Sequence, residues 1–243
     1  MKVIGVIPAR YGSSRFPGKP LALIHGKPMI QRVYEQVAQS KMLDIVVVAT
    51  DHEQIKETVE GFGGNVVMTS ADHETGSDRM AEVTRKVDGD FYVNIQGDEP
   101  LIRYELVDSL VEAAKDSPEA VVTAKTAISN MEDVLDPNIV KVVTDNQGFA
   151  RYFSRSPIPY NRAENKTIYY KHLGIYGYPK AVINTFVQLP ASHLEETEVL
   201  EQLRLLDNGY AIKVVETSYN AVGVDTPEDI EKVEKILGGI QHV

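Results

Sequence analysis

The chain opens with the run Val3-Ile-Gly-Val-Ile-Pro8 and the loop Ala9-Arg-Tyr-Gly-Ser-Ser-Arg-Phe-Pro-Gly-Lys-Pro20. The run is short, apolar and β-branched, which is typical of a buried strand. Three more runs of this kind follow, at residues 45–49, 66–68 and 91–95. Between them, apolar residues recur at helical spacing, at residues 29–37 and 55–62. Strands that alternate with helices predict an α/β fold built on a mainly parallel sheet.

The second half of the chain has a different pattern. Its strand-like runs have no helical pattern between each pair, which predicts an additional antiparallel part; they are residues 141–144, 152–154 and 174–178. Residues 156–165 are rich in turn-forming residues, which predicts an exposed loop. Residues 195–206 are predicted to form one helix with Val199, Leu203 and Leu206 facing inward. Thr226 is predicted to cap the last helix, because a proline follows it and an aspartate comes three residues later.

The composition excludes several classes of protein. The 243 residues include 25 basic and 35 acidic side chains, so the formal net charge is −10, and there is no cysteine. This charge argues against a general nucleic-acid binder, and the lack of cysteine excludes disulfides and thiolate nucleophiles. No apolar run approaches the roughly 20 residues of a membrane span, and the first run is too short for a secretory signal. We therefore expect a cytoplasmic protein that does not insert into membranes.

The loop after the first run concentrates positive charge. Arg10, Arg15 and Lys19 lie among small residues whose amides can approach a ligand closely. Amide donors and point charges together stabilise a triphosphate, whereas solvation poorly explains three clustered cations in an acidic protein. The spacing of Gly12 and Gly18 fits neither a P-loop nor a dinucleotide-binding fingerprint. As a loop cation, Lys19 is expected to contribute little to the stability of the fold.

Two aspartates that follow apolar stretches are candidate metal ligands. Asp98 comes shortly after the run at 91–95, and Asp225 follows the stretch at 221–224. If both stretches are strands, both carboxylates lie at strand carboxyl ends, where α/β sheets bind ligands. Two carboxylates with phosphate oxygens and waters form the oxygen-only site that Mg²⁺ prefers. Taken singly, Asp98 is equally explained as a turn residue, and Asp225 as an extra anion at a helix start.

Motifs along the whole chain resemble those of the cytidylyltransferases that activate eight- and nine-carbon acid sugars. The first motif runs from Ile7 to Leu21 and by itself indicates only the wider nucleotidyltransferase superfamily. The others are Ala49-Thr-Asp-His52, Asn94-Ile-Gln-Gly-Asp-Glu-Pro100, Tyr152-Phe-Ser-Arg155, Lys171-His-Leu-Gly-Ile-Tyr-Gly-Tyr178, Leu200-Glu-Gln-Leu-Arg204 and Gly223-Val-Asp-Thr-Pro-Glu-Asp229. The resemblance implies a Rossmann-like nucleotidyltransferase fold with a mixed, mainly parallel sheet.

The resemblance favours one composite domain over residues 1–243, because no low-complexity linker interrupts it. Within this domain the CTP-binding part is expected over residues 1–125 and the sugar-binding, antiparallel part over residues 126–220. A strand and helix that carry a metal ligand are expected over residues 221–243.

The resemblance also implies roles for residues of this sequence. Those expected to be catalytic are Arg10, Arg15, Lys19, Asp98 and Asp225, and the two aspartates are expected to bind Mg²⁺. The expected CTP-binding residues are Pro8, Ala9, Arg10, Gly12, Ser13, Arg15, Lys19, Ser77, Arg79 and Gln96. The expected sugar-binding residues are Gln96, Arg155, His172, Tyr176, Glu201 and Gln202.

Several of these positions also have structural explanations. His172 and Tyr176 lie four apart on a presumed strand and so share one face, where core packing would also place them. Arg79 is also explained as a charge on a helix surface, and Glu201 as a solvated helix charge.

The implied reaction is transfer of a cytidylyl group from CTP to the anomeric hydroxyl of Kdo, an acidic eight-carbon keto-sugar, with release of pyrophosphate. The product would serve lipopolysaccharide biosynthesis. Direct in-line attack needs no covalent protein nucleophile, so catalysis would consist of positioning and charge neutralisation. The alternatives are a related acid sugar, such as the 8-amino analogue of Kdo or a sialic acid, and a non-catalytic nucleotide-binding regulatory subunit. The resemblance also implies a homodimer.

Overall fold

The chain forms two compact units in the computed structural model, which describes residues 1–12, 16–73 and 75–240. Unit 1 is made of Met1–Asp108 and Ala221–Val243, and unit 2 of Ser109–Asn220. The boundary falls inside helix α4 (Tyr104–Asp116). The sequence predicts a nucleotide-binding part that ends near residue 125, whereas the first unit ends earlier and the C-terminal segment returns to it.

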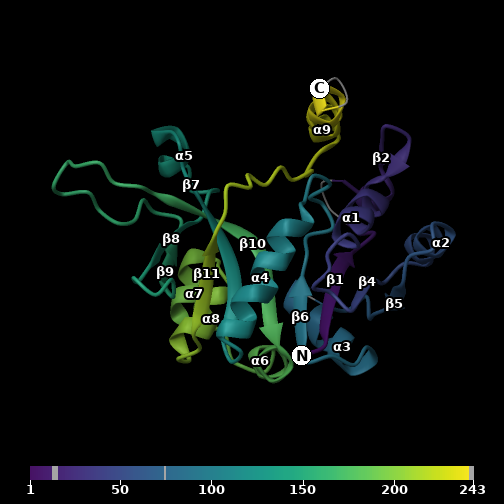
Figure 1. The fold of residues 1–243 in the computed structure, drawn as a ribbon, viewed down its shortest axis with the longest axis horizontal. Helices are drawn as coiled ribbons and strands as arrows, with labels where there is room; N and C mark the ends of the chain where they lie inside the picture. The colour runs from purple at the N-terminus through teal and green to yellow at the C-terminus, as the bar shows by residue number, and fades with distance from the viewer. Residues whose placement is uncertain (13–15, 74, 241–243) are drawn as a thin grey trace. The chain divides into compact units, whose positions relative to one another are not determined.

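A parallel sheet forms the centre of unit 1 (Figure 1). Its strands are ordered β6-β1-β4-β5, and each neighbouring pair is parallel. They are β1 (Val3–Ala9), β4 (Ile45–Thr50), β5 (Val66–Met68) and β6 (Phe91–Asn94). Because β1 is paired on both sides and buried along nearly all of its length, its sequence is continuously apolar rather than alternating. The four apolar runs therefore form the strands that the sequence predicts.

Three helices connect these strands. They are α1 (Met29–Val37), α2 (Glu53–Gly61) and α3 (Gly76–Lys86). The fully buried residues of α1 are Met29, Ile30, Val33 and Val37, and their helical spacing produces one apolar face. α3 begins at a capping box in which Thr75 and Asp78 exchange hydrogen bonds, so local sequence defines where this helix starts.

The C-terminal segment of unit 1 packs near the residues that follow the first loop. These are the short helix η1 (Lys19–Leu21) and the hairpin of β2 (Leu23–Ile24) and β3 (Lys27–Pro28). Helix α9 (Pro227–Ile240) packs on β2. The buried residues of this apolar cluster are Ile24, Met29, Val224 and Val233. Their burial brings segments together that are about two hundred positions apart in the sequence.

Unit 2 is built on mixed strand pairing. β7 (Val121–Ala127) pairs in parallel with β11 (Ile212–Glu216) and antiparallel with β10 (Tyr170–Pro179). β8 (Lys141–Thr144) and β9 (Ala150–Ser154) form an antiparallel hairpin, and β8 also pairs with β10. The helices are α5 (Met131–Leu135), α6 (Lys180–Phe186), α7 (His193–Glu198) and α8 (Gln202–Asp207). The predicted fold class, mainly parallel strands with an additional antiparallel part, is confirmed.

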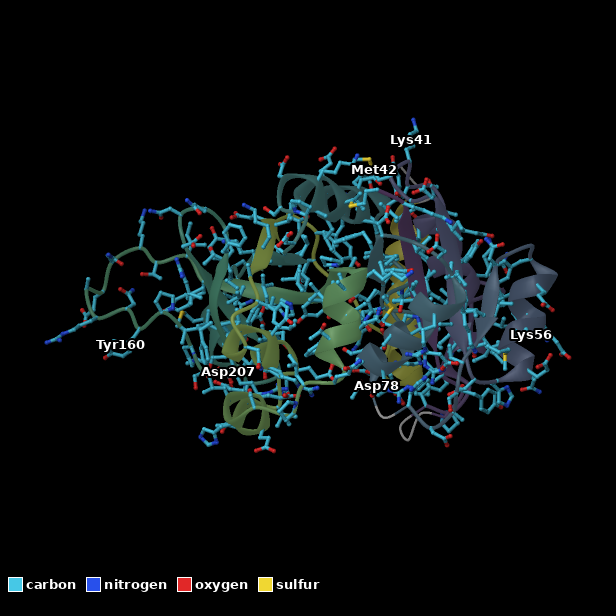
Figure 2. All side chains as sticks on the ribbon, turned by 90° about the horizontal axis from the view of Figure 1, so that it is seen from below. Lys41, Met42, Lys56, Asp78, Tyr160 and Asp207 are labelled. Carbon is cyan, nitrogen blue, oxygen red and sulfur yellow. The ribbon has the colours of Figure 1, made fainter. Side chains whose placement is uncertain are left out.

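The segment between β9 and β10 extends from unit 2 as a long loop (Figure 1). Tyr160 lies on this loop with 88% of its surface exposed (Figure 2), as expected for the turn-rich residues 156–165. Across the described ranges, every helix is too short or too polar to span a bilayer.

Two local predictions are wrong. Residues 195–206 do not form one helix, because α7 ends at Glu198 and Val199 has a left-handed backbone with φ 54°. Val199 is 74% exposed, whereas Leu203 is fully buried as predicted. Residues 221–224 form no strand and run without regular structure into α9. The helical spacing of apolar residues does not reveal that a single residue between them has a left-handed backbone. A short apolar stretch can likewise be buried in a cluster without pairing as a strand.

Candidate active site

Three parallel strands of unit 1 end at the same edge of their sheet. Ala9 and Thr50, the last residues of β1 and β4, pair with each other, and Val6 pairs with Asn94 at the end of β6. Ligands of α/β sheets bind at this edge. The expected site residues at or just after these strand ends are Pro8, Ala9, Arg10, Gly12, Gln96 and Asp98.

Tyr11, in the loop after β1, contacts two segments of unit 1. Its carbonyl accepts a hydrogen bond from the Gly18 N–H at 2.9 Å, and its ring stacks on the imidazole of His52 with centroids 3.9 Å apart. Gly18 has φ 70°, a backbone conformation that glycine adopts without steric cost. Ser13 and Arg15, both expected to bind CTP, lie outside the described residues, and their roles stay predictions.

Lys19 lies at the centre of this site. Its Nζ donates to Oδ2 of Asp98 at 2.6 Å and to the carbonyl of Val224 at 2.8 Å, and it lies 3.6 Å from Oδ1 of Asp225. One ammonium therefore contacts both aspartates that the sequence predicts to converge. The Lys19 side chain is 14% exposed, against 35% for Asp98 and 55% for Asp225. Both carboxylates thus keep a side that solvent or a ligand can reach.

Backbone contacts bring the two aspartates together. The N–H of Val224 donates to the carbonyl of Asp98 at 2.9 Å. Gly97 allows its segment to run close to β1, because the carbonyl oxygen of Pro8 lies 2.6 Å from the position that a Cβ would occupy. A side chain at Gly97 would displace the Asp98 segment from the strand.

The cap of α9 holds the other aspartate. Asp229 accepts hydrogen bonds from the N–H groups of Asp225 at 3.1 Å and Thr226 at 3.0 Å. A hydrogen bond from Lys232, together with these two N–H groups, holds the pKa of Asp229 well below its ordinary value. The sequence correctly predicts the helix start at Thr226.

The surroundings of Lys19 and Asp225 differ from expectation in two ways. Lys19 is not a solvated loop cation, because its ammonium links the η1 segment to two others in a mostly buried position. Its loss is therefore expected to destabilise unit 1. Asp225 does not follow a strand; it precedes α9 and is positioned by the cap.

The two carboxylates fit a hard divalent cation. No cluster of three or more acidic or histidine ligands occurs among the residues that the structure describes. A cation at Asp98 and Asp225 would therefore complete its shell with phosphate oxygens and water, the usual arrangement for Mg²⁺. Lys19 and the two aspartates carry formal charges that sum to −1. That balance attracts a cation, and a triphosphate would be repelled unless a divalent cation or the arginines of the first loop outweighed the negative charge.

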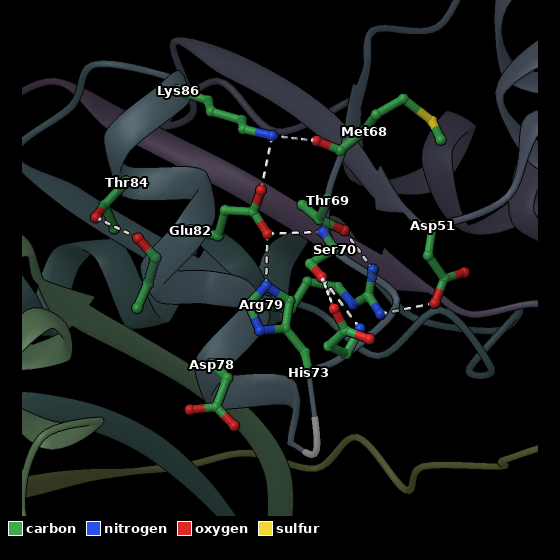
Figure 3. Close-up of polar contacts among 12 residues, drawn as sticks. Asp51, Met68, Thr69, Ser70, His73, Asp78, Arg79, Glu82, Thr84 and Lys86 are labelled. Atoms are coloured by element: carbon green, nitrogen blue, oxygen red, sulfur yellow. Dashed lines mark hydrogen bonds and ion pairs between the residues drawn. The ribbon is translucent and has the colours of Figure 1, made fainter.

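Arg79 lies inside unit 1 rather than on its surface. Its side chain is 1% exposed, Nη2 donates to Oδ2 of Asp51 at 2.9 Å, and Nη1 donates to the hydroxyl of Thr69 (Figure 3). The explanation of Arg79 as a helix-surface charge is therefore wrong. The guanidinium links α3 to residues that follow β4 and β5. Its expected contact with CTP stays a prediction, as does that of Ser77, which is buried in the first turn of α3.

A second group of contacts holds the segment after β5 on α3 (Figure 3). Glu82 accepts a hydrogen bond from the Ser70 N–H at 2.8 Å, and it lies 2.5 Å from Nε2 of His73 and 2.7 Å from Nζ of Lys86. Burial alone would raise the pKa of Glu82, but the donors Lys86, Ser70 and His73 lower it to about 2. These contacts fix the backbone that leads into the first turn of α3.

His172 and Tyr176 lie together on β10 in unit 2. Their ring centroids are 5.3 Å apart, and Phe153 meets the His172 ring edge-on at 4.9 Å. The pairing of β10 with β7 shifts register just before Tyr176, so a regular two-residue alternation does not describe this strand. Burial raises the pKa of Tyr176 well above its ordinary value, and the charges of Tyr178 and Glu201 raise it further. Glu201 therefore lies within electrostatic reach of Tyr176.

Thr123 lies against the ring of His172. Its hydroxyl is within donating distance of the carbonyls of Ile175 (2.7 Å) and Leu173 (3.2 Å) and lies 3.0 Å from Nε2 of His172. A hydroxyl has a single proton, so when it donates to either carbonyl it accepts from the Nε2–H, and Nδ1 is then the acceptor of the ring. Burial lowers the pKa of His172 to about 3, so the ring is neutral near pH 7. A neutral acceptor suits a ligand that carries hydroxyl groups.

The other expected sugar-binding residues have different surroundings. The guanidinium of Arg155 donates to the carbonyls of Pro137, Glu198 and Val199. Gln202 is buried at the start of α8, and Glu201 is the N-cap residue of that helix. Gln96, expected to contact both substrates, belongs to unit 1. The structure thus gathers His172, Tyr176 and Glu201, and the sugar contacts themselves stay predictions.

Five residues that hold the expected site residues in place have no predicted role in the sequence. They are Asp51, Thr123, Lys141, Glu198 and Val224. Asp51 comes directly after a strand within one of the quoted motifs, so its position was a usable signal. Val224 acts through its main-chain carbonyl, which every residue has, and therefore leaves no signal in the sequence.

The chain is similar along its length to known proteins of one family. The family model described as Cytidylyltransferase matches residues 4–218. A protein named 3-deoxy-manno-octulosonate cytidylyltransferase from Syntrophotalea carbinolica is 52% identical over 99% of this chain and 100% of its own. A protein of the same name from Thermodesulfovibrio yellowstonii is 50% identical over 98% of each chain.

Solved structures agree with this similarity. A structure described as CMP:2-keto-3-deoxy-manno-octonic acid synthetase complexed with CTP superposes with a TM-score of 0.95 and 48% identity over 100% of both chains. A 4-diphosphocytidyl-2C-methyl-D-erythritol synthase from Anaerococcus prevotii has a TM-score of 0.67 at 20% identity, covering 98% of this chain and 99% of that one. At that identity the second likeness concerns the fold alone.

Replacing Lys19 by methionine should destabilise the protein by about 2 kcal/mol, because Asp98, Asp225 and the Val224 carbonyl lose a charged donor in a mostly buried site. Urea unfolding measures the change. The matched control is Lys27→Met, which removes an ion pair with Glu35 between largely exposed side chains and should cost less than about 1 kcal/mol. Equal losses in the two variants would return Lys19 to the role of a solvated cation.

The low pKa of His172 should make the protein acid-sensitive. The unfolded chain binds a proton at this position below the ordinary pKa of 6.5, whereas the folded chain does so only near 3, so stability falls as the pH drops through this window. Between pH 7 and pH 5 this contribution amounts to about 2 kcal/mol. His172→Gln should remove it, so the variant should lose less stability than the parent over that interval. Identical pH profiles of unfolding would contradict the buried, neutral histidine.

Proposed function

We propose that this chain transfers a cytidylyl group from CTP to Kdo and releases pyrophosphate. The chain belongs to the 3-deoxy-manno-octulosonate cytidylyltransferases of the cytidylyltransferase family. The observation that carries the proposal is the convergence of Asp98 and Asp225 on Lys19 beside a parallel sheet. The product, CMP-Kdo, would serve lipopolysaccharide biosynthesis.

The reaction is a direct displacement at the α-phosphorus of CTP. A bond forms between this phosphorus and the anomeric oxygen of the sugar, the bond to the β-phosphate bridging oxygen breaks, and pyrophosphate leaves with its electron pair. The anomeric hydroxyl releases its proton to solvent as the new bond forms. Because no covalent enzyme intermediate is needed, the residues act by holding the substrates and by neutralising charge.

Unit 1 supplies the charges for the triphosphate. Lys19 is held rigidly by three oxygen partners, so its ammonium needs little reorganisation when phosphate oxygens approach. Arg10 is exposed directly after β1 and is proposed to bind the same anion, together with Arg15. Asp98 and Asp225 are proposed to hold Mg²⁺, which when bound would neutralise phosphate charge and polarise the reacting phosphoryl group.

Unit 2 is proposed to supply the polar contacts to the sugar. His172 is proposed to present an acceptor Nδ1 on a neutral ring, Tyr176 keeps its phenolic proton, and the charge of Glu201 acts on Tyr176. Acceptors and donors of this kind match the hydroxyl groups of a sugar, and polar pairing discriminates strongly against a ligand that leaves a partner without its hydrogen bond. A cytoplasmic location, expected from the composition, and a homodimer, expected from the family resemblance, complete the proposal.

Four nucleoside triphosphates tested against Kdo, its 8-amino analogue and a sialic acid should show turnover for CTP with Kdo at least about tenfold above every other pair. Pyrophosphate release measures turnover, and mass spectrometry identifies the nucleotide sugar. A higher kcat/KM for the 8-amino analogue or the sialic acid would reassign the substrate. Binding of CTP without pyrophosphate release in any combination would favour the non-catalytic subunit.

Asp98→Asn and Asp225→Asn should each lower kcat about a thousandfold, because roughly 4 kcal/mol of transition-state stabilisation would be lost with the metal. The double variant should be little worse than either single one, since both act through the same ion. The Mg²⁺ concentration for half-maximal activity should rise in each single variant.

The matched control for this pair is Asp72→Asn, an exposed carboxylate of unit 1 that accepts from the hydroxyl of Ser70 at 3.2 Å. Its kcat should stay within about twofold of the parent, because a surface substitution of this kind disturbs little. Multiplicative losses in the double variant, with unchanged Mg²⁺ dependence in both single ones, would contradict a shared metal site.

A further inference from the structure

The corner between α7 and α8 has an unusual backbone. Val199 has φ 54° and ψ 53°, and it is 74% exposed. Helices that end on a left-handed residue normally use glycine or asparagine there, and a β-branched residue in this conformation is a genuine outlier. Such strain persists only where surrounding contacts impose it, and it is concentrated at functional positions. The contacts that impose it at Val199 therefore indicate what the corner does.

Arg155 makes these contacts. Its Nε donates to the carbonyl of Glu198 at 2.7 Å, and its Nη2 donates to the carbonyl of Val199 at 3.3 Å. Its Nη1 donates to the carbonyl of Pro137 at 2.9 Å. The planar guanidinium thus holds two consecutive peptide groups of the corner against the segment that precedes β8. A lysine has no comparable set of fixed donors.

Arg155 is itself anchored at its backbone. Its N–H donates to Oε2 of Glu198 at 2.9 Å, and Oε1 of the same carboxylate accepts from Ser154 at 2.6 Å. Its carbonyl accepts from Nζ of Lys141 at 2.5 Å. Lys141 is fully buried, and burial lowers its pKa. The backbone N–H and carbonyl of Arg155 are therefore both held by hydrogen bonds, which fixes the position from which its side chain extends to the corner.

The corner leads directly into expected sugar-binding residues. The N-cap residue of α8, Glu201, lies two positions after Val199, and the first residue of the helix, Gln202, lies three positions after it. Gln202 is 7% exposed, and the charge of Glu201 acts on Tyr176. A change in the backbone at Val199 would therefore rotate the start of α8 and move both side chains relative to the aromatic pair.

We propose that Arg155 is a positioning residue, which holds Val199 in its left-handed conformation and thereby orients Glu201 and Gln202 toward the sugar. The inference rests on the proposed function and changes the role of Arg155 within it. Arg155 acts on the sugar through the α7–α8 corner, and its guanidinium remains on backbone carbonyls instead of binding the sugar carboxylate.

Rescue by a second substitution tests this assignment. Arg155→Met should raise the KM for Kdo at least about tenfold while the Kd for CTP, measured by calorimetry, changes less than about twofold. Val199→Gly makes the left-handed conformation intrinsically favourable. The double variant Arg155→Met/Val199→Gly should therefore recover a KM within about threefold of the parent. Arg155→Lys keeps the charge without the fork and should behave like Arg155→Met, with the same rescue.

Two controls exclude general effects. Arg151→Met removes an arginine from β9, the strand that ends just before Arg155; Arg151 is 70% exposed and paired with Asp145, and its loss should leave the KM for Kdo near that of the parent. Arg155→Met combined with Asn208→Gly places the glycine at the other end of α8, where φ is −95°, and should give no rescue. A double variant with Val199→Gly that is as impaired as Arg155→Met would overturn the proposal, because an arginine that acts by holding Val199 in its left-handed conformation must become dispensable once glycine adopts that conformation by itself.

Amide hydrogen exchange separates this proposal from the proposed function. Arg155→Met should accelerate exchange at the backbone amides of residues 200–203, and Val199→Gly should reverse the change in the absence of substrates. Unchanged exchange in Arg155→Met would refute the positioning role even if Kdo is the substrate. Failure of the parent protein to use Kdo would refute the proposed substrate, and the exchange measurement would still decide the role of Arg155.

Discussion

The ammonium group of Lys19 is the interaction on which the site of unit 1 depends. Two carboxylates at one place repel each other unless a positive charge lies between them, and Lys19 contacts both Asp98 and Asp225. Its third bond, to the Val224 carbonyl, ties the same charge to the backbone. The apolar cluster around Ile24 and the close approach of Gly97 to β1 bring the three segments within reach of this single group.

The charge of this group determines what it can bind. With a formal sum of −1, the group of Lys19, Asp98 and Asp225 cannot by itself attract a triphosphate. It becomes a phosphate site only when a divalent cation joins it or when the arginines of the first loop outweigh it. A mostly buried lysine that is already desolvated and oriented is suited to this exchange, because its reorganisation cost is met during folding.

Unit 2 handles polar groups differently, mainly by keeping them neutral or by surrounding them with carbonyl oxygens. Burial keeps His172 unprotonated and Tyr176 protonated, so the aromatic pair offers hydrogen bonds without net charge. Backbone carbonyl oxygens surround the ammonium of Lys141 and the guanidinium of Arg155. Such carbonyls are fixed dipoles, so the two cations also determine the path of the chain around the α7–α8 corner.

Elements whose cause is local or periodic could be predicted from the sequence. The four apolar runs became parallel strands, the spacing from Met29 to Val37 became a buried helix face, and α9 began directly after Thr226, whose N–H donates to Asp229. The sequence also indicated that Asp98 and Asp225 belong together. Only the tertiary structure decided that Lys19 joins them, that Arg79 is buried on Asp51, and that residues 195–206 break at Val199. These outcomes depend on contacts between distant segments, on main-chain carbonyls common to all residues, and on one left-handed backbone angle, none of which leaves a periodic signal in the sequence.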